Sequence, residues 1–224
     1  MGRRSLRAVT ERWAAVVLAG GRARRLGGVD KPALSVGDRT LLDGVLAACD
    51  GAEPIVVVGP PRPTARPVLW EREEPSHGGP LAALAAGLRA VPAGVEVTAL
   101  LAADLPNLTR GTLRRLHEAL GEDRDGALLV DAAGLRQWLC GVWRTEAVRA
   151  ALAAAGDPTD RPVRALLGRL DAAEVAAEPG EAFDVDTPDD LRVAGRHAPD
   201  DLRAAGRPPA EGDLHSRHTA RPVT

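Results

Sequence analysis

The chain has 224 residues, of which 45% are hydrophobic and 2% aromatic, and its formal net charge at pH 7 is -2. This length is enough for one domain with a substantial core. The scarcity of aromatic side chains argues against a stacking platform for single-stranded nucleic acid, and the near-neutral charge argues against a basic surface for duplexes. We therefore expect no nucleic-acid partner.

The first residues are rich in arginine and faintly resemble a twin-arginine signal. Glu11 and Arg12 interrupt this pattern, and the apolar run that follows at residues 14–19 is too short for a signal sequence. No stretch approaches the roughly 20 apolar residues that a membrane span needs. We interpret residues 1–13 as a basic N-terminal leader of a cytoplasmic protein without a membrane partner.

Apolar runs that suit buried strands alternate with helical periodicities along most of the chain. Residues 14–19 form a continuous apolar run, which is typical of a strand in a parallel sheet. Further strands are predicted at residues 54–58, 67–70, 95–103, 126–130, 139–143 and 175–177. Helices are predicted after Thr40, Gly79 and Thr109, at residues 145–155 and 161–168, and from Thr187 onward. The helix after Gly79 is expected to carry Leu81, Leu84, Ala85 and Leu88 on its apolar face.

This alternation predicts an α/β fold with one Rossmann-like three-layer domain, built around a mostly parallel sheet over residues 14–196. Ligands of such sheets bind at the carboxyl ends of the strands. The loops that follow Ala19, Val58, Trp70 and Ala103 are therefore the expected binding region. Residues 197–224 have paired prolines, scattered charge and no apolar period, and we interpret them as a disordered tail.

The strongest chemical signal is the segment at residues 18–31, which reads LAGGRARRLGGVDK. Glycines directly after a buried strand let the backbone approach a phosphate and aim N–H groups at it. The arginines and Lys31, the only lysine of the chain, would neutralise a triphosphate. The segment matches neither the P-loop pattern nor the GxGxxG dinucleotide pattern. A flexible turn with solvated arginines is the alternative interpretation.

Two carboxylates stand where a metal ion could be held. Asp104 follows the predicted strand at residues 95–103, and Asp186 directly precedes Thr187 at a predicted helix start. Mg²⁺ prefers one or two carboxylates together with phosphate oxygens and water. Each residue also has a structural explanation, because Asp104 suits a turn before Pro106 and Asp186 could cap the helix.

Four motifs in order resemble the MobA-like NTP transferase family, and most closely its molybdenum cofactor guanylyltransferases. They are the glycine segment at residues 18–31, GGPL at residues 78–81, LLAADLP at residues 100–106 and FDVDTPDDL at residues 183–191. The resemblance covers roughly residues 14–195 and implies a fold of the nucleotide-diphospho-sugar transferase type.

The resemblance also implies roles for the matching positions. It assigns nucleotide binding to Leu18, Ala19, Gly20, Gly21, Arg25, Lys31, Glu71, Gly79 and Asp104. Arg25, Lys31 and Asp104 would be the catalytic residues. Asp104 and Asp186, or Asp184 in place of Asp186, would hold Mg²⁺. Glu71 stands where the family usually has an aspartate.

The activity implied is transfer of GMP from GTP to the phosphate of the molybdopterin cofactor, with release of pyrophosphate. Molybdoenzyme-maturation proteins are the implied protein partners. One alternative is a cytidylyltransferase or another NTP transferase with a different phosphate acceptor. A second is a nucleotide-binding partner in molybdoenzyme maturation without turnover. A dinucleotide-dependent oxidoreductase is disfavoured because GxGxxG is absent.

Two departures from the family pattern leave the choice of base and acceptor open. After the second predicted strand the chain reads Gly59-Pro60-Pro61, where many relatives carry a polar residue near the base. The segment at residues 136–143 resembles the family's strand that lines the acceptor site but lacks its usual His/Pro pair. The pattern LAGG favours guanine by resemblance alone.

Overall fold

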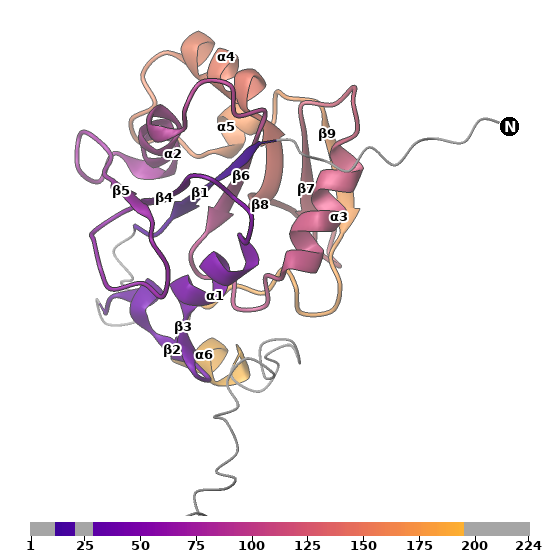
Figure 1. The fold of residues 1–224 in the computed structure, drawn as a ribbon. Coiled ribbons are helices and arrows are strands. Elements are labelled where there is room, and N and C mark those ends of the chain that lie inside the picture. The colour runs from indigo at the N-terminus through magenta and orange to yellow at the C-terminus, as the bar shows by residue number, and fades with distance from the viewer. Residues whose placement is uncertain (1–11, 21–28, 195–224) are drawn as a thin grey trace, which may run out of the picture.

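The computed structural model describes residues 12–20 and 29–194, which form a seven-stranded sheet covered by helices, with a small hairpin at one end (Figure 1). The sheet strands are β1 (Trp13–Leu18), β4 (Ile55–Val58), β5 (Leu69–Glu71), β6 (Val97–Ala102), β7 (Gly126–Val130), β8 (Arg136–Arg144) and β9 (Ala172–Ala176). The hairpin consists of β2 (Ser35–Val36) and β3 (Arg39–Thr40). The helices are the 3-10 turn η2 (Lys31–Ala33), α1 (Leu41–Ala48), α2 (Gly79–Ala90), α3 (Arg110–Leu120), α4 (Thr145–Ala155), α5 (Arg164–Leu167) and α6 (Pro188–Ala194).

The strand order is β5-β4-β1-β6-β8-β7-β9, and only β8 runs antiparallel among these strands of the described chain. The predicted α/β fold with a mostly parallel sheet is therefore confirmed. β1 lies between β4 and β6, so that chain segments far apart in sequence end side by side. Because β8 is reversed, its first half lies at the edge where the neighbouring strand β6 ends, with Cys140 opposite Leu101.

Alternating side chains of the buried strands supply two apolar layers. Ala15 and Val17 of β1 pack in the layer that contains α1 and α3, whereas Ala14 and Val16 pack in the layer with α2, α4 and α5. The sheet is buried on both faces, which explains why its strands read as continuous apolar runs and not as alternating ones. The result is the predicted three-layer sandwich (Figure 1).

The helix starts follow from local capping. The Thr40 hydroxyl accepts a hydrogen bond from the Asp43 N–H at 3.0 Å and begins α1. Thr109 and Thr112 form a capping box at the start of α3. Both starts were expected, because a Thr before an apolar period satisfies backbone N–H groups that have no partner inside the helix.

The differences from the predicted elements are local. β8 extends from Arg136 and is longer than the strand predicted at residues 139–143. The hairpin β2–β3 was not predicted, since strands of two residues carry no periodic signal. Ala85 is only half-buried and lies off the apolar face of α2, where Ala82 and Ala86 are buried instead.

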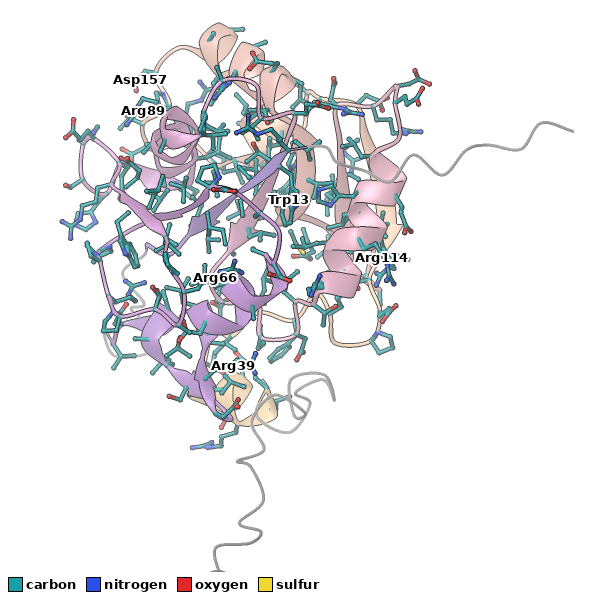
Figure 2. The ribbon with its side chains drawn as sticks, in the orientation of Figure 1. Trp13, Arg39, Arg66, Arg89, Arg114 and Asp157 are labelled. Carbon is teal, nitrogen blue, oxygen red and sulfur yellow. The ribbon has the colours of Figure 1, made fainter. Side chains whose placement is uncertain are left out.

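The predicted ends of the domain are mostly untested. Trp13, assigned above to the leader, instead begins β1 and packs edge-on against His117 of α3, with 5.0 Å between ring centroids (Figure 2). Residues 1–11 and the predicted tail at residues 197–224 lie outside the described residues. Within the described part of the chain, every helix is too short or too polar to cross a membrane.

Close packing of α2 on the sheet depends on Gly87. A Cβ atom at this position would lie 2.4 Å from Val16 Cγ1 and 2.9 Å from Val58 Cγ2, and both valines are fully buried. We expect Gly87→Ala to lower the free energy of unfolding by about 1–3 kcal/mol through overpacking. Urea denaturation followed by circular dichroism measures this change.

Gly44 of α1 provides the matched control, because its added Cβ would meet only Arg39 Cδ at 3.9 Å. We expect Gly44→Ala to be neutral or to stabilise by up to about 1 kcal/mol, as alanine favours the helix. Equal effects of the two substitutions would contradict the packing argument.

Candidate functional site

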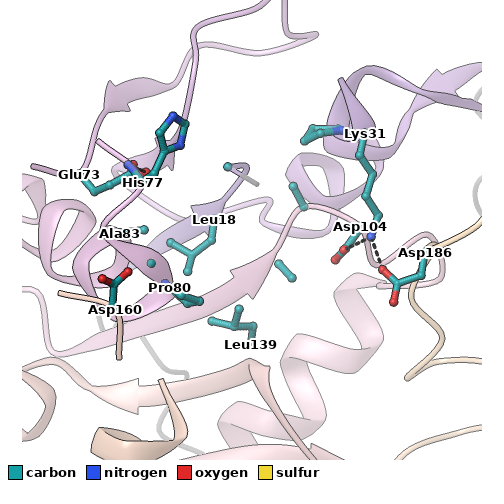
Figure 3. A pocket seen from close by; sticks show the side chains of 15 residues that line it. Leu18, Lys31, Glu73, His77, Pro80, Ala83, Asp104, Leu139, Asp160 and Asp186 are labelled. Atoms are coloured by element: carbon teal, nitrogen blue, oxygen red, sulfur yellow. Dashed lines mark hydrogen bonds and ion pairs between the residues drawn. The ribbon is translucent and has the colours of Figure 1, made fainter. Parts of the chain in front are cut away.

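A pocket of about 620 Å³ opens where β1 and β6 end (Figure 3). Its lining includes six residues that the sequence analysis selected: Leu18, Gly20, Lys31, Gly79, Asp104 and Asp186. The expected binding region at the carboxyl ends of the strands therefore coincides with a concave site.

Three charged side chains converge at one end of this pocket. The Lys31 Nζ lies 2.6 Å from Asp104 Oδ2 and 2.9 Å from Asp186 Oδ1. The side chains of Lys31 and Asp104 are 15% and 26% exposed, and that of Asp186 is 49% exposed. The two carboxylates thus converge on one cation, from positions 73 and 155 residues away in the chain.

Asp104 and Asp186 shift the pKa values of the ionisable groups beside them. Burial acts to lower the pKa of Lys31, but its hydrogen bonds to Asp104 and Asp186 and their negative charges outweigh this effect and raise the pKa. Asp184 lies beside the same cluster. Desolvation, followed by repulsion from Asp186 and Asp104, raises the pKa of Asp184 above its usual range. Asp184 thus adds a third carboxyl group beside Lys31 within the described part of the chain.

Backbone contacts bring the two carboxylate segments together. The Ala103 N–H donates to the Leu18 carbonyl at 3.1 Å, which extends the pairing of β1 and β6 up to Asp104. The Val185 N–H donates to the Asp104 carbonyl at 3.2 Å. The side chains of Asp104 and Asp186 therefore project from two joined backbones towards the same ammonium.

The helix cap at α6 does not require the Asp186 side chain. The Thr187 hydroxyl accepts from the Asp190 N–H at 3.2 Å, and the Asp190 carboxylate accepts from the N–H groups of Asp186 and Thr187. Thr187 thus provides the predicted N-cap. The carboxylate of Asp186 is left to face Lys31, which favours the charged-site interpretation over the capping one.

A buried ion pair holds the C-terminal segment on α3. The Glu181 side chain, 6% exposed, accepts from Arg115 Nη2 at 2.8 Å, from the Glu178 N–H at 2.8 Å and from the Thr112 hydroxyl. Val185 is buried with Leu41 and the end of α6, which packs beside β2. These contacts fix the course of residues 178–186 and so the position of Asp186.

The carboxylates beside Lys31 could hold Mg²⁺ only together with oxygens from a substrate and water. Across residues 12–20 and 29–194, no group of three or more His, Cys, Asp or Glu side chains is arranged to hold a metal ion. Asp104 and Asp186 nevertheless direct oxygens to one point, now taken by the Lys31 ammonium. Mg²⁺ takes only one or two carboxylates when phosphate oxygens and water complete its shell. These two residues fit such an ion.

Other predicted site residues have different positions. Ala19 is buried and Glu71 ends β5, and both lie outside the pocket lining. Glu73, two residues further, does line the pocket. Gly21 and Arg25 fall outside the described residues, so their predicted roles remain predictions.

The opposite end of the pocket carries residues that the sequence analysis missed. Figure 3 shows Glu73, His77 and Asp160 there, with Leu18 and Leu139 between them and Lys31. His77 and Asp160 both have positive φ angles, 66° and 54°, which are uncommon outside glycine. No motif surrounds Asp160, and tertiary contacts, including its N–H to the Gly78 carbonyl at 2.7 Å, bring it to the pocket.

Comparison with known proteins agrees with the class that the sheet order and pocket define, an α/β fold of the nucleotidyltransferase type. The profile of the MobA-like NTP transferase domain matches residues 15–174. A molybdenum cofactor guanylyltransferase of Mesorhizobium japonicum is 33% identical over 82% of this chain and 94% of that protein. A probable molybdenum cofactor guanylyltransferase of Mycobacterium marinum is 33% identical over 80% of this chain and 90% of that protein. The chain belongs to the MobA-like NTP transferase family.

Solved structures show the same fold. Molybdopterin-guanine dinucleotide biosynthesis protein A of Archaeoglobus fulgidus superposes with a TM-score of 0.61 at 20% identity, over 82% of this chain and 97% of its own. A 2-C-methyl-D-erythritol 4-phosphate cytidylyltransferase of Thermus thermophilus superposes with a TM-score of 0.65 at 22% identity, over 84% of this chain and 98% of its own. At these identities the likeness concerns the fold alone and leaves base and acceptor open.

The Glu181 ion pair predicts a pH-dependent stability. Burial opposes ionisation of Glu181, but hydrogen bonds from Arg115, Thr112 and the Glu178 N–H outweigh it and lower the pKa below its unfolded value. A lowered pKa stabilises the fold above the unfolded pKa, and this contribution is lost as the pH falls through the folded pKa. We expect Glu181→Gln to lower the free energy of unfolding at pH 7 by about 1.5–3 kcal/mol.

Urea denaturation of both proteins between pH 7 and pH 3 measures the difference. The difference in free energy of unfolding between the two proteins should shrink towards acid pH, where Glu181 of the wild type becomes neutral. A difference that stays constant across this pH range would contradict an ionised Glu181 in the folded protein.

Proposed function

We propose that this protein is a magnesium-dependent guanylyltransferase that transfers GMP from GTP to the terminal phosphate of the molybdopterin cofactor. The observation that carries the proposal is the convergence of Lys31, Asp104 and Asp186 with the Gly20 backbone in one pocket at the end of β1. Family membership and the printed names of the relatives support the same activity. The protein would act in the cytoplasm, with molybdoenzyme-maturation proteins as partners.

The proposed reaction is an in-line displacement at the α-phosphorus of GTP. A phosphate oxygen of the acceptor forms the new P–O bond, the bond to the bridging oxygen of the β-phosphate breaks, and pyrophosphate leaves with that electron pair. The acceptor oxygen is already an anion, so the reaction needs no general base. Catalysis then consists of alignment and charge neutralisation.

Each proposed residue has a distinct part in that alignment. Lys31 would exchange its two carboxylate contacts for phosphate oxygens and neutralise charge on the transferred and leaving groups. Arg25 is proposed to do the same from the glycine segment. Asp104 and Asp186 would hold Mg²⁺, which would supply positive charge to the phosphates. As Lys31 turns to the phosphate oxygens, Asp104 and Asp186 would exchange their contacts with its ammonium for contacts with the metal.

The remaining predicted residues would bind the nucleoside. The proposed contacts to the nucleoside come from the backbone at Leu18, Ala19, Gly20 and Gly21 and from Gly79 at the start of α2. Because Glu71 lies outside the pocket lining and Glu73 within it, Glu73 is the better candidate for the acidic contact.

A cytidylyltransferase is the second candidate, because a cytidylyltransferase of Thermus thermophilus has the same fold. Incubation of the protein with Mg²⁺, the molybdopterin cofactor and each NTP separately distinguishes the two by product mass and pyrophosphate release. We expect the GMP adduct from GTP. A CMP adduct, or nucleotide binding without any product, would replace the proposal with one of its alternatives.

Removing either charge of the central pair should stop turnover. We expect Lys31→Ala and Asp104→Ala each to lower kcat by roughly 10²–10³-fold or more, because a charge-stabilising group is lost. Asp38→Asn is the control, since exposed Asp38 pairs only with the adjacent Arg39 in the described residues. Near-normal turnover of either alanine variant, with circular dichroism unchanged in all three, would refute the assignment.

The metal site predicts a second measurement without substrate. The Lys31 ammonium contacts both carboxylates and would compete with a metal ion for them, so Lys31→Met should raise the affinity of the free protein for Mn²⁺ several-fold. Electron paramagnetic resonance of unbound Mn²⁺ gives this affinity directly. An affinity equal to or below that of the wild type would contradict a metal site at Asp104 and Asp186.

A further inference from the structure

Arg62 lies in the loop after β4, and its side chain is 8% exposed. Its Nη1 donates to the Ala19 carbonyl at 3.3 Å, and its Nε lies 3.0 Å from Asp30 Oδ2. The contact with Asp30 is an ion pair without hydrogen-bond geometry. One buried guanidinium thus contacts two residues that are 11 positions apart in the sequence.

The surroundings of Arg62 hold its guanidinium in place. The Cζ atom lies 5.7 Å from the centre of the Trp70 ring, a cation–π contact. Gly59 begins the loop at φ 152°, and a Cβ there would lie 2.7 Å from the Ala19 carbonyl oxygen. Only glycine allows the loop to run this close to the end of β1. Pro61 and Pro63, on either side of Arg62, restrict the backbone further.

The two residues that Arg62 contacts border the functional groups of the pocket. Ala19 precedes Gly20, whose backbone lines the pocket. Asp30 precedes Lys31, and its carbonyl accepts from the Ala33 N–H at 3.0 Å, which closes the first turn of η2. The position of Asp30 therefore determines where the backbone of Lys31 lies and from where its side chain extends.

We propose that Arg62 is a positioning residue, which sets the place of the Lys31 ammonium relative to the Gly20 backbone by joining Ala19 to Asp30. Its kinetic consequence rests on the proposed nucleotidyl transfer, but the placement of Lys31 does not. Arg62 fulfils this role from outside the pocket lining, because it acts through Ala19 and Asp30 and not on a substrate.

Lysine cannot replace Arg62 in this role. The planar guanidinium meets a carbonyl and a carboxylate with different nitrogens while its face lies over the indole ring of Trp70. A lysine ammonium is a single point charge on a flexible chain and lacks a stacking face. Arg62→Lys should therefore behave more like a loss of the side chain than like a conservative change.

The sole lysine of the chain makes the placement measurable without turnover. We expect Arg62→Gln to increase the acetylation rate of Lys31 by an N-hydroxysuccinimide ester several-fold, because the ammonium is held less firmly between its carboxylates. Peptide mass spectrometry separates Lys31 from the N-terminal amine. A rate equal to that of the wild type would overturn the proposal, whether or not the protein transfers nucleotides.

Arg66 gives the matched control. It lies on the same connection between β4 and β5, and its Nη1 donates to the Leu46 carbonyl of α1 at 3.1 Å (Figure 2). Arg66→Gln therefore removes a comparable carbonyl contact without touching Ala19 or Asp30. It should leave the Lys31 rate unchanged, whereas an equal increase would show general loosening and overturn the specific role of Arg62.

Kinetics provide the second test. We expect Arg62→Ala and Arg62→Lys to lower kcat by roughly 10- to 100-fold through misplacement of Lys31, with a smaller change in the KM for the nucleotide. Added guanidinium ion should restore part of the activity of Arg62→Ala and none in Lys31→Ala. A lysine variant as active as the wild type, or no recovery with guanidinium, would contradict the proposal.

Discussion

The contact of the Lys31 ammonium with Asp104 and Asp186 determines the arrangement of the site, because it joins three parts of the chain that the fold brings to one edge. Two carboxylates facing each other without a cation would repel, and a buried lysine without partners would lose its charge. Each group therefore depends on the others. In the proposed function, a triphosphate would replace the carboxylates beside Lys31, and a divalent ion would replace Lys31 beside the carboxylates.

Three further contacts hold the segments that carry these charged groups. The parallel pairing of β1 with β6 places Leu18 and Asp104 side by side. The buried pair of Glu181 and Arg115 fixes the segment that carries Asp186. Arg62 contacts Asp30, the residue before Lys31. Stability and chemistry are linked here, since loosening any of these three supports would move a charge of the site.

Sequence reasoning succeeded where the signal is local or where the chemistry is unusual. Buried strands read as apolar runs, Thr40 and Thr109 cap helices, and the single lysine after the glycine segment lines a pocket at the expected edge of the sheet. Arg62 and Asp160 could not be found in this way, because their roles depend on tertiary contacts with Trp70 and Gly78. The resemblance predicts Glu71, which ends β5, whereas Glu73 in the loop beyond it lines the pocket.

The pKa of Lys31 tests the central contact most directly. The chain has one lysine, so reductive ¹³C-methylation gives one side-chain NMR signal besides that of the N-terminal amine. The account predicts that this pKa lies above the ordinary value in the wild type and falls in Asp104→Asn, as one of its two carboxylate partners is lost. An identical pKa in the two proteins would contradict the account.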